Sequence, residues 1–226
     1  AIDIDHMIES EIEYYNEQEY EQRFVESFTT VIPRVKYVWD NTQWNFTHPV
    51  NGSRFFMKYR TSPGISKKSL TFHSLTVDGR KYIPLFNGIS IGGRFFGGTN
   101  WGSDAQKFRL GGVPWIFSSD EYRNSSGSIS AEELYFSEYV TPVRGNHLSN
   151  KLGRNVFLGN LELRLPFLIY YFPAIKYLGQ INGVLFTDFG VAWNDKYPEF
   201  RERSSWESNT NDHTGWIMSY GFGPRF

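Results

Sequence analysis

Residues 155–167 read NVFLGNLELRLPF, and residues 181–194 read INGVLFTDFGVAWN. Most of the large apolar side chains share one parity: Phe157, Leu161, Leu163, Leu165 and Phe167 in the first run, and Ile181, Leu185, Phe189, Val191 and Trp193 in the second. This alternation is typical of β-strands with one apolar and one polar face. Glu162 and Asp188 both fall on the polar parity. If the connection folds back symmetrically about residue 174, the two carboxylates lie almost opposite each other on neighbouring antiparallel strands.

A cation is expected between these two acids, because facing carboxylates repel unless a proton or a positive charge separates them. Arg144, in the run Val143-Arg144-Gly145, is the candidate, since its planar guanidinium can bond both acids at once. Two alternatives exist: three separate surface charges, or the acid pair of a glycoside hydrolase. An arginine between the acids would occupy the catalytic space, so no enzymatic activity is expected.

The composition restricts the class of protein. The 226 residues include 20 Phe, 14 Tyr, 7 Trp and 21 Gly, which suits many strands, tight turns and aromatic girdles. A formal net charge of −1 gives no reason to expect nucleic acid as a partner. The absence of cysteine excludes disulfides and thiolate metal sites. The histidines are scattered without metal-ligand spacing, so neither a metal nor another cofactor is expected.

The strands and connections alternate along the chain. Residues 1–26 are acidic, and we expect an acidic loop or the end of a preceding strand there. Residues 102–154 lack periodicity, and a loop of this length within a compact domain is usually functional. Outer-membrane barrels have the same asymmetry of brief turns and extended external loops. The segments that alternate as strands are residues 27–40, 53–61, 70–85, 89–101, 155–167, 181–194 and 216–226.

Several short motifs follow one another in a fixed order. An Asp-Asn-Thr run at residues 40–42 comes first, with Pro49 and Gly52 behind it. The later motifs are Phe-x-Leu-Gly-Gly at 108–112, Val-Arg-Gly at 143–145, Leu-Glu-Leu-Arg-x-Pro at 161–166 and Phe-x-Asp-x-Gly-x-x-Trp at 186–193. In this order and spacing they resemble the outer-membrane protein assembly and two-partner secretion transporter superfamily, also called the bacterial surface antigen family.

The resemblance covers residues 27–226 and implies an all-β fold, an antiparallel transmembrane β-barrel of sixteen strands in the bacterial outer membrane. This chain would supply about seven of those strands, from the C-terminal half of the barrel. Loop 102–154 would fold into the lumen, and the arginine at its tip would bond the lumen-facing acids. The residues implied are Arg144, Glu162 and Asp188 for this tether, and Val143, Gly145, Gly111 and Gly112 for the loop motifs. Many members have an aromatic residue where this chain has Asn146.

The function implied by the resemblance is to assist the insertion of other proteins into the outer membrane, or their translocation across it. The expected partners are outer-membrane lipid and lipopolysaccharide, client outer-membrane or secreted proteins, and periplasmic or lipoprotein subunits. Two alternatives stay open: an outer-membrane channel or transporter for small solutes, and a soluble all-β domain that binds carbohydrate through its aromatic residues. We expect the natural protein to continue beyond both ends of the chain.

Overall fold

The fold is a set of β-strands. The computed structural model describes residues 2–15, 19–44, 48–64, 70–86, 88–112, 138–140, 142–146, 150–165, 182–194 and 215–225. Within these ranges every regular element is a strand. A search of the same residues for a helix with the length and hydropathy needed to cross a membrane finds none.

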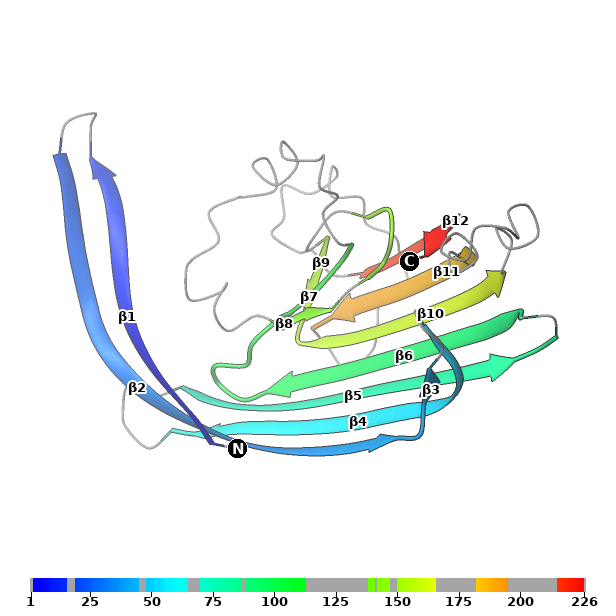
Figure 1. Cartoon of the computed structure of the whole chain (residues 1–226). Coiled ribbons are helices and arrows are strands. Elements are labelled where there is room, and N and C mark those ends of the chain that lie inside the picture. Colours follow the sequence, from blue (N-terminus) through cyan, green and yellow to red (C-terminus); the bar gives the residue numbers. More distant parts are fainter. Residues whose placement is uncertain are drawn as a thin grey trace.

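One large sheet contains most of the described chain. In spatial order its strands are β1 (Ile2–Tyr15), β2 (Glu19–Asp40), β4 (Pro49–Pro63), β5 (Thr71–Pro84), β6 (Ser90–Trp101), β10 (Asn155–Leu165), β11 (Asn182–Trp193) and β12 (Gly215–Arg225). All neighbours along this path are antiparallel, and the short β3 (Gln43–Trp44) pairs with β4. Figure 1 shows the sheet curved into a trough, with β1 and the first part of β2 extending from it as a hairpin.

The strands agree with the alternation in the sequence, which confirms an all-β fold built on an antiparallel sheet. Each predicted segment coincides with one strand of the large sheet, from β2 to β12. The described strands form an open sheet, so closure and the total number of strands stay predictions. Residues 2–15 and 19–26 lie in β1 and β2, where we expected an acidic loop or the end of a preceding strand. Isoleucines alternate with acidic residues in part of this segment, as in a strand, but the prediction followed the acidic composition instead.

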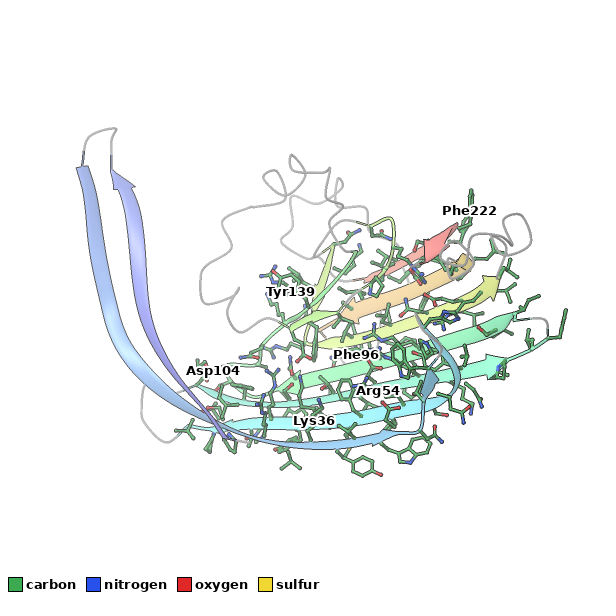
Figure 2. The ribbon with its side chains drawn as sticks, viewed as in Figure 1. Lys36, Arg54, Phe96, Asp104, Tyr139 and Phe222 are labelled. Carbon is green, nitrogen blue, oxygen red and sulfur yellow. The ribbon has the colours of Figure 1, made fainter. Side chains whose placement is uncertain are left out.

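The two faces of the large sheet differ in chemistry. On the convex face the side chains are apolar or aromatic and exposed, as in strands that face lipid. They include Val35, Tyr37, Trp39, Met57, Phe95, Phe157, Leu161, Leu185, Met218, Tyr220 and Phe222. The concave face has polar and charged side chains from the opposite parity of the same strands. Figure 2 shows these side chains along the curved sheet.

The described strands of segment 102–154 form a small sheet of their own, which lies over the concave face (Figure 1). Its strands are β7 (Phe108–Leu110), β8 (Glu138–Val140) and β9 (Lys151–Gly153), in the order β8–β7–β9. β7 pairs with β8 in parallel and with β9 in antiparallel. A buried apolar cluster joins the small sheet to β6, β10, β11 and β12: Phe96, Phe108, Leu110, Val140, Val143, Val156, Leu158, Ala192 and Ile217.

Candidate functional site

Arg144 connects the tip of segment 142–146 to the concave face of β10 and β11. Its Nε and Nη2 donate to the two carboxylate oxygens of Asp188, at 2.8 Å and 2.6 Å. Its Nη1 donates to Oε1 of Glu162 at 2.9 Å. The backbone N–H of Arg144 also donates to Asp188, at 2.9 Å. One guanidinium therefore bonds both acids, with the two-pronged geometry that makes arginine–carboxylate pairs strong.

The surroundings of Asp188 reinforce this contact. The Asp188 side chain is fully buried, and it also accepts a hydrogen bond from Nδ2 of Asn160 at 2.8 Å. The same Asn160 nitrogen donates to the carbonyl of Pro142 at 2.9 Å, so it fixes the loop backbone as well. The ring of Phe186 lies 3.7 Å from the guanidinium carbon of Arg144, a cation–π contact.

The sequence placed the two acids correctly on the polar face and almost opposite each other. Asp188 lies opposite Asn160, and Glu162 lies opposite Phe186. This register does centre on residue 174, as expected. The acids are nevertheless diagonal neighbours, two positions apart along the strands, because that midpoint pairs each acid with a different residue. The guanidinium of Arg144 spans this diagonal.

The charge of Arg144 is favoured by its partners. Burial opposes the charged form, but the hydrogen bonds and negative charge of Asp188, and then of Glu162, outweigh that effect. The pKa of Arg144 is therefore raised above its ordinary value.

Arg164 is a second cation of this cluster, and the sequence analysis did not assign it a role. Its Nε and Nη2 donate to Oε2 of Glu162 at 3.1 Å and 2.9 Å, so Glu162 bridges two arginines. Its side chain is only 3% exposed and lies over the ring of Tyr82. The sequence does indicate this contact, because Arg164 lies two residues after Glu162 and alternate residues of a strand share one face.

Arg164 also reaches the turn between β2 and β4. Its Nη1 donates to the carbonyl of Pro49 at 2.6 Å. That turn is held by its own polar residues, since Asn41 Oδ1 accepts from the N–H of Ser53 and Gly52 has a φ of 98°. The Asp-Asn-Thr motif thus positions a carbonyl for Arg164. A continuous set of bonds therefore connects the loop tip, through Glu162 and Arg164, to a turn at the opposite end of the strands.

The glycines of the loop motifs permit close backbone packing. A Cβ on Gly112 would lie 2.0 Å from the carbonyl oxygen of Asn146, so only glycine fits there. Gly111 accepts from the N–H of Val143 at 2.9 Å, and Gly145 has a left-handed φ of 76°. The two motifs therefore form one folded unit that presents Arg144.

This unit packs closely on β11. The side chain of Val143 is fully buried. A Cβ on Gly190 would lie 2.8 Å from Leu110 and 3.2 Å from Val143, so that glycine lets the loop approach the sheet.

A second ionic contact holds the loop to the other side of the trough. Glu138 of β8 accepts from Nζ of Lys58 at 2.9 Å and 3.1 Å, and from Nη2 of Arg60 at 2.9 Å. Lys58 and Arg60 lie on β4. The sequence analysis missed Glu138 because it lies in the aperiodic segment. Among the described residues, two ionic contacts thus hold the loop to the sheet, one through a cation of the loop and the other through an acid.

Comparison with known proteins gives one result. The model of the Omp85 superfamily domain matches residues 6–226, which is nearly the whole chain. No curated protein matches it. Within the described residues no group of three metal-ligating side chains is arranged to hold an ion.

Proposed function

The chain belongs to the Omp85 superfamily, and on that premise we propose that it assists other proteins to insert into the outer membrane or to cross it. The superfamily consists of bacterial outer-membrane proteins, so the chain is an outer-membrane protein. The match confirms the family and the location that the motifs predicted. The clients are outer-membrane or secreted proteins, and the surrounding partners are outer-membrane lipid and lipopolysaccharide. Periplasmic or lipoprotein subunits would complete the assembly.

The described sheet would be part of a closed barrel of sixteen strands, as the family resemblance implies. Two observations support this proposal. Most of the exposed apolar side chains of the described strands lie on one face of the sheet, and most of the charged side chains lie on the other. The sheet path also ends in open edges at β1 and β12, and hydrocarbon does not tolerate unpaired edges. In a closed barrel the small sheet β8–β7–β9 would lie in the lumen.

The observation that carries the proposal is the bonding of Arg144 to Asp188 and Glu162. Its role would be positional, because it holds segment 102–154 against the wall along which a client would pass. Removing one partner from a buried ion pair costs about 3–5 kcal/mol, and a partly hydrated lumen lowers that cost. Loss of this contact would therefore free the segment more than it would unfold the sheet.

The test is an Arg144→Ala variant of the full-length protein in outer-membrane vesicles or detergent. We expect protease to cleave between β7 and β8 at least several-fold faster, while the heat-modifiable migration of the folded barrel is kept. Insertion or secretion of a client should fall in the same samples. Arg154→Ala is the matched control, since Arg154 is exposed on the connection into β10. Unchanged cleavage of Arg144→Ala would contradict the tether.

A channel for small solutes is the alternative function. A polar cavity of about 180 Å³ beside the tether favours it, with Arg80, Arg94, Arg144, Arg164, Asn160 and Glu162 among its lining residues. Single-channel recording in planar bilayers separates the two functions. A steady open pore in the intact protein indicates a solute channel. A pore that opens only in Arg144→Ala indicates a passage that the tethered loop keeps closed.

A further inference from the structure

The concave face is basic on one side of the trough. Along the described parts of β2, β4, β5 and β6, the cations on this face are Arg34, Lys36, Arg54, Lys58, Arg60, Arg80 and Arg94. Among residues 31–40 of β2 and the described residues of β4, β5 and β6, the carboxylates on the same face are Asp40 and Asp78. On β10 and β11 the balance is reversed, with Arg164 beside Glu162 and Asp188. Because the whole chain has a net charge of −1, its composition does not account for this basic wall.

Several contacts place these cations on the concave face. Lys58 and Arg60 bond Glu138 of the loop that lies over that face. Arg80 and Arg94 both bond the buried Asp78. Residues adjacent to these cations in the sequence point to the convex face and are exposed and apolar: Val35, Tyr37, Met57 and Phe95. Figure 2 labels Lys36 and Arg54, which lie on the neighbouring strands β2 and β4.

The strand register pairs cations with cations. The directly opposed pairs are Arg34 with Arg60, Lys36 with Lys58, Arg54 with Arg80, and Arg80 with Arg94. Like charges directly opposite each other on neighbouring strands are destabilising. Asp40, Asp78 and Glu138 offset part of this repulsion. Among the described residues of this face the cations outnumber the carboxylates, which favours binding of an anion from outside the sheet.

The spacing of the cations fits an extended acidic chain. Lys58 and Arg60 are alternate residues of one strand, as are Arg34 and Lys36. Alternate residues of a strand lie about 6.7 Å apart, which is also the separation of same-side residues in an extended peptide. A lipid headgroup fits less well, because the cations face away from the apolar surface on which acyl chains would lie.

The loop already carries an example of the contact. The Glu138 carboxylate, on an extended segment, bonds Lys58 and Arg60 together. The side chains of all three residues are about one-fifth exposed, so the site is open to water and to exchange. A client carboxylate could therefore replace Glu138 at the same two cations.

From these observations we infer that the concave face of β2, β4, β5 and β6 is a binding track for acidic, extended segments of client proteins. The inference rests on the proposed function, because it specifies the class of client segment that this function would handle. Glu138 occupies the track in the absence of a client. Client binding and release of the β8 side of the loop are then competing events on the same cations.

The test measures peptide binding to the full-length protein in detergent at low ionic strength. The probes are two fluorescent peptides of about twelve residues, one alternating Glu with Thr and the other Lys with Thr. We expect the acidic peptide to bind at least tenfold more tightly. The double variant Lys36→Glu/Arg54→Glu should weaken its binding by about tenfold, since reversed charges repel it and the effect is screened by salt. Glu138→Gln should tighten it several-fold, because the internal competitor is lost.

Lys81→Glu is the matched control. Lys81 is exposed on the opposite face of β5, so the same change of charge there should alter acidic-peptide binding less than twofold. Equal binding of the two peptides would overturn the track. So would a loss in Lys81→Glu as large as in the double variant, which would indicate a lipid-facing surface. Competition by inorganic phosphate at the same charge concentration would indicate a site for small anions and would also overturn it.

Folding and function are checked on the same samples. Glu138→Gln keeps the inference testable if the double variant fails to show folded-barrel migration on gels. Client insertion by the wild-type protein is measured in parallel. Intact insertion without a preference for the acidic peptide overturns the track alone. A wild-type protein that handles no client overturns the proposed function, whichever peptide it prefers.

Discussion

Two ionic contacts of the described loop residues use opposite chemistry, and their partners on the sheet differ in burial. At β10 and β11 the loop supplies a cation, Arg144, and its main partner Asp188 is fully buried. At β4 the loop supplies an acid, Glu138, and both partners are about one-fifth exposed. Asp188 also accepts from a backbone N–H and from Asn160, whereas the Glu138 contact consists of two side-chain pairs.

The difference predicts two different roles. A buried charge that loses its partner keeps its desolvation cost, so breaking the Arg144 contact is expensive. A partly exposed pair is screened by water and salt, and such pairs contribute about 1 kcal/mol or less. We therefore expect the Arg144 side to be the fixed anchor of the loop, and the Glu138 side to be the part that opens. The following variants test this contrast, from the largest expected effect to the smallest.

Asp188→Ala should have the largest effect. It removes the fully buried acid that accepts from the Arg144 side chain and backbone N–H and from Asn160, and breaking such a buried pair costs up to about 3–5 kcal/mol. We expect rapid proteolysis between β7 and β8. On gels, the heated sample should lose the migration of the folded barrel at a lower temperature than the wild type does. The control is Asp104→Ala, an exposed carboxylate that accepts from the backbone of Thr71. If both variants behaved alike, the burial of Asp188 would have no special importance.

Gly112→Ala should come next. The added methyl group would lie 2.0 Å from the Asn146 carbonyl oxygen, so the backbone of the turn must shift and carry Arg144 with it. Such overpacking costs about 1–3 kcal/mol. Protease digestion measures the effect, with Gly97→Ala as control because nothing lies within 4 Å of a Cβ there. Equal resistance of the two variants would show that the motif does not need a glycine at this position.

Glu138→Gln should have the smallest effect on the loop, about 1 kcal/mol or less. The variant removes the charge that pairs with Lys58 and Arg60 but keeps the shape of the side chain. In the wild type, raising the salt concentration from about 50 to 500 mM should loosen the β8 side in the same way, because salt screens exposed pairs. Hydrogen exchange of residues 138–140 measures both effects. An effect as large as that of Asp188→Ala would remove the distinction between anchor and opening side.

More of the Arg144 contact than of the Glu138 contact could be predicted from the sequence. Strand parity placed Glu162 and Asp188 on one face, and symmetric folding placed the turn centre at residue 174. These features depend on local alternation, which long strands display clearly. The midpoint of 174 also accounts for the diagonal placement of the acids, because it pairs Glu162 with Phe186 and Asp188 with Asn160.

Nothing in the local sequence around Glu138 predicted its contact with β4. β7, β8 and β9 are three-residue strands, which are too short to show a period, so the small sheet and Glu138 were not predicted. The bond from Arg164 to Pro49 joins residues 115 positions apart, and no spacing along the chain indicates it. The close packing at Gly112 and Gly190 could not be predicted, since the carbonyl and the side chains that approach these glycines come from other segments of the chain.

The most direct test of the anchor is a double-mutant cycle on Arg144 and Asp188. The rates of proteolysis between β7 and β8 are measured for wild type, Arg144→Ala, Asp188→Ala and the double variant. If the two residues act through one contact, the double variant is cleaved no faster than the more sensitive single variant. Rates that multiply, as for two independent sites, would contradict a loop held to β10 and β11 by this pair.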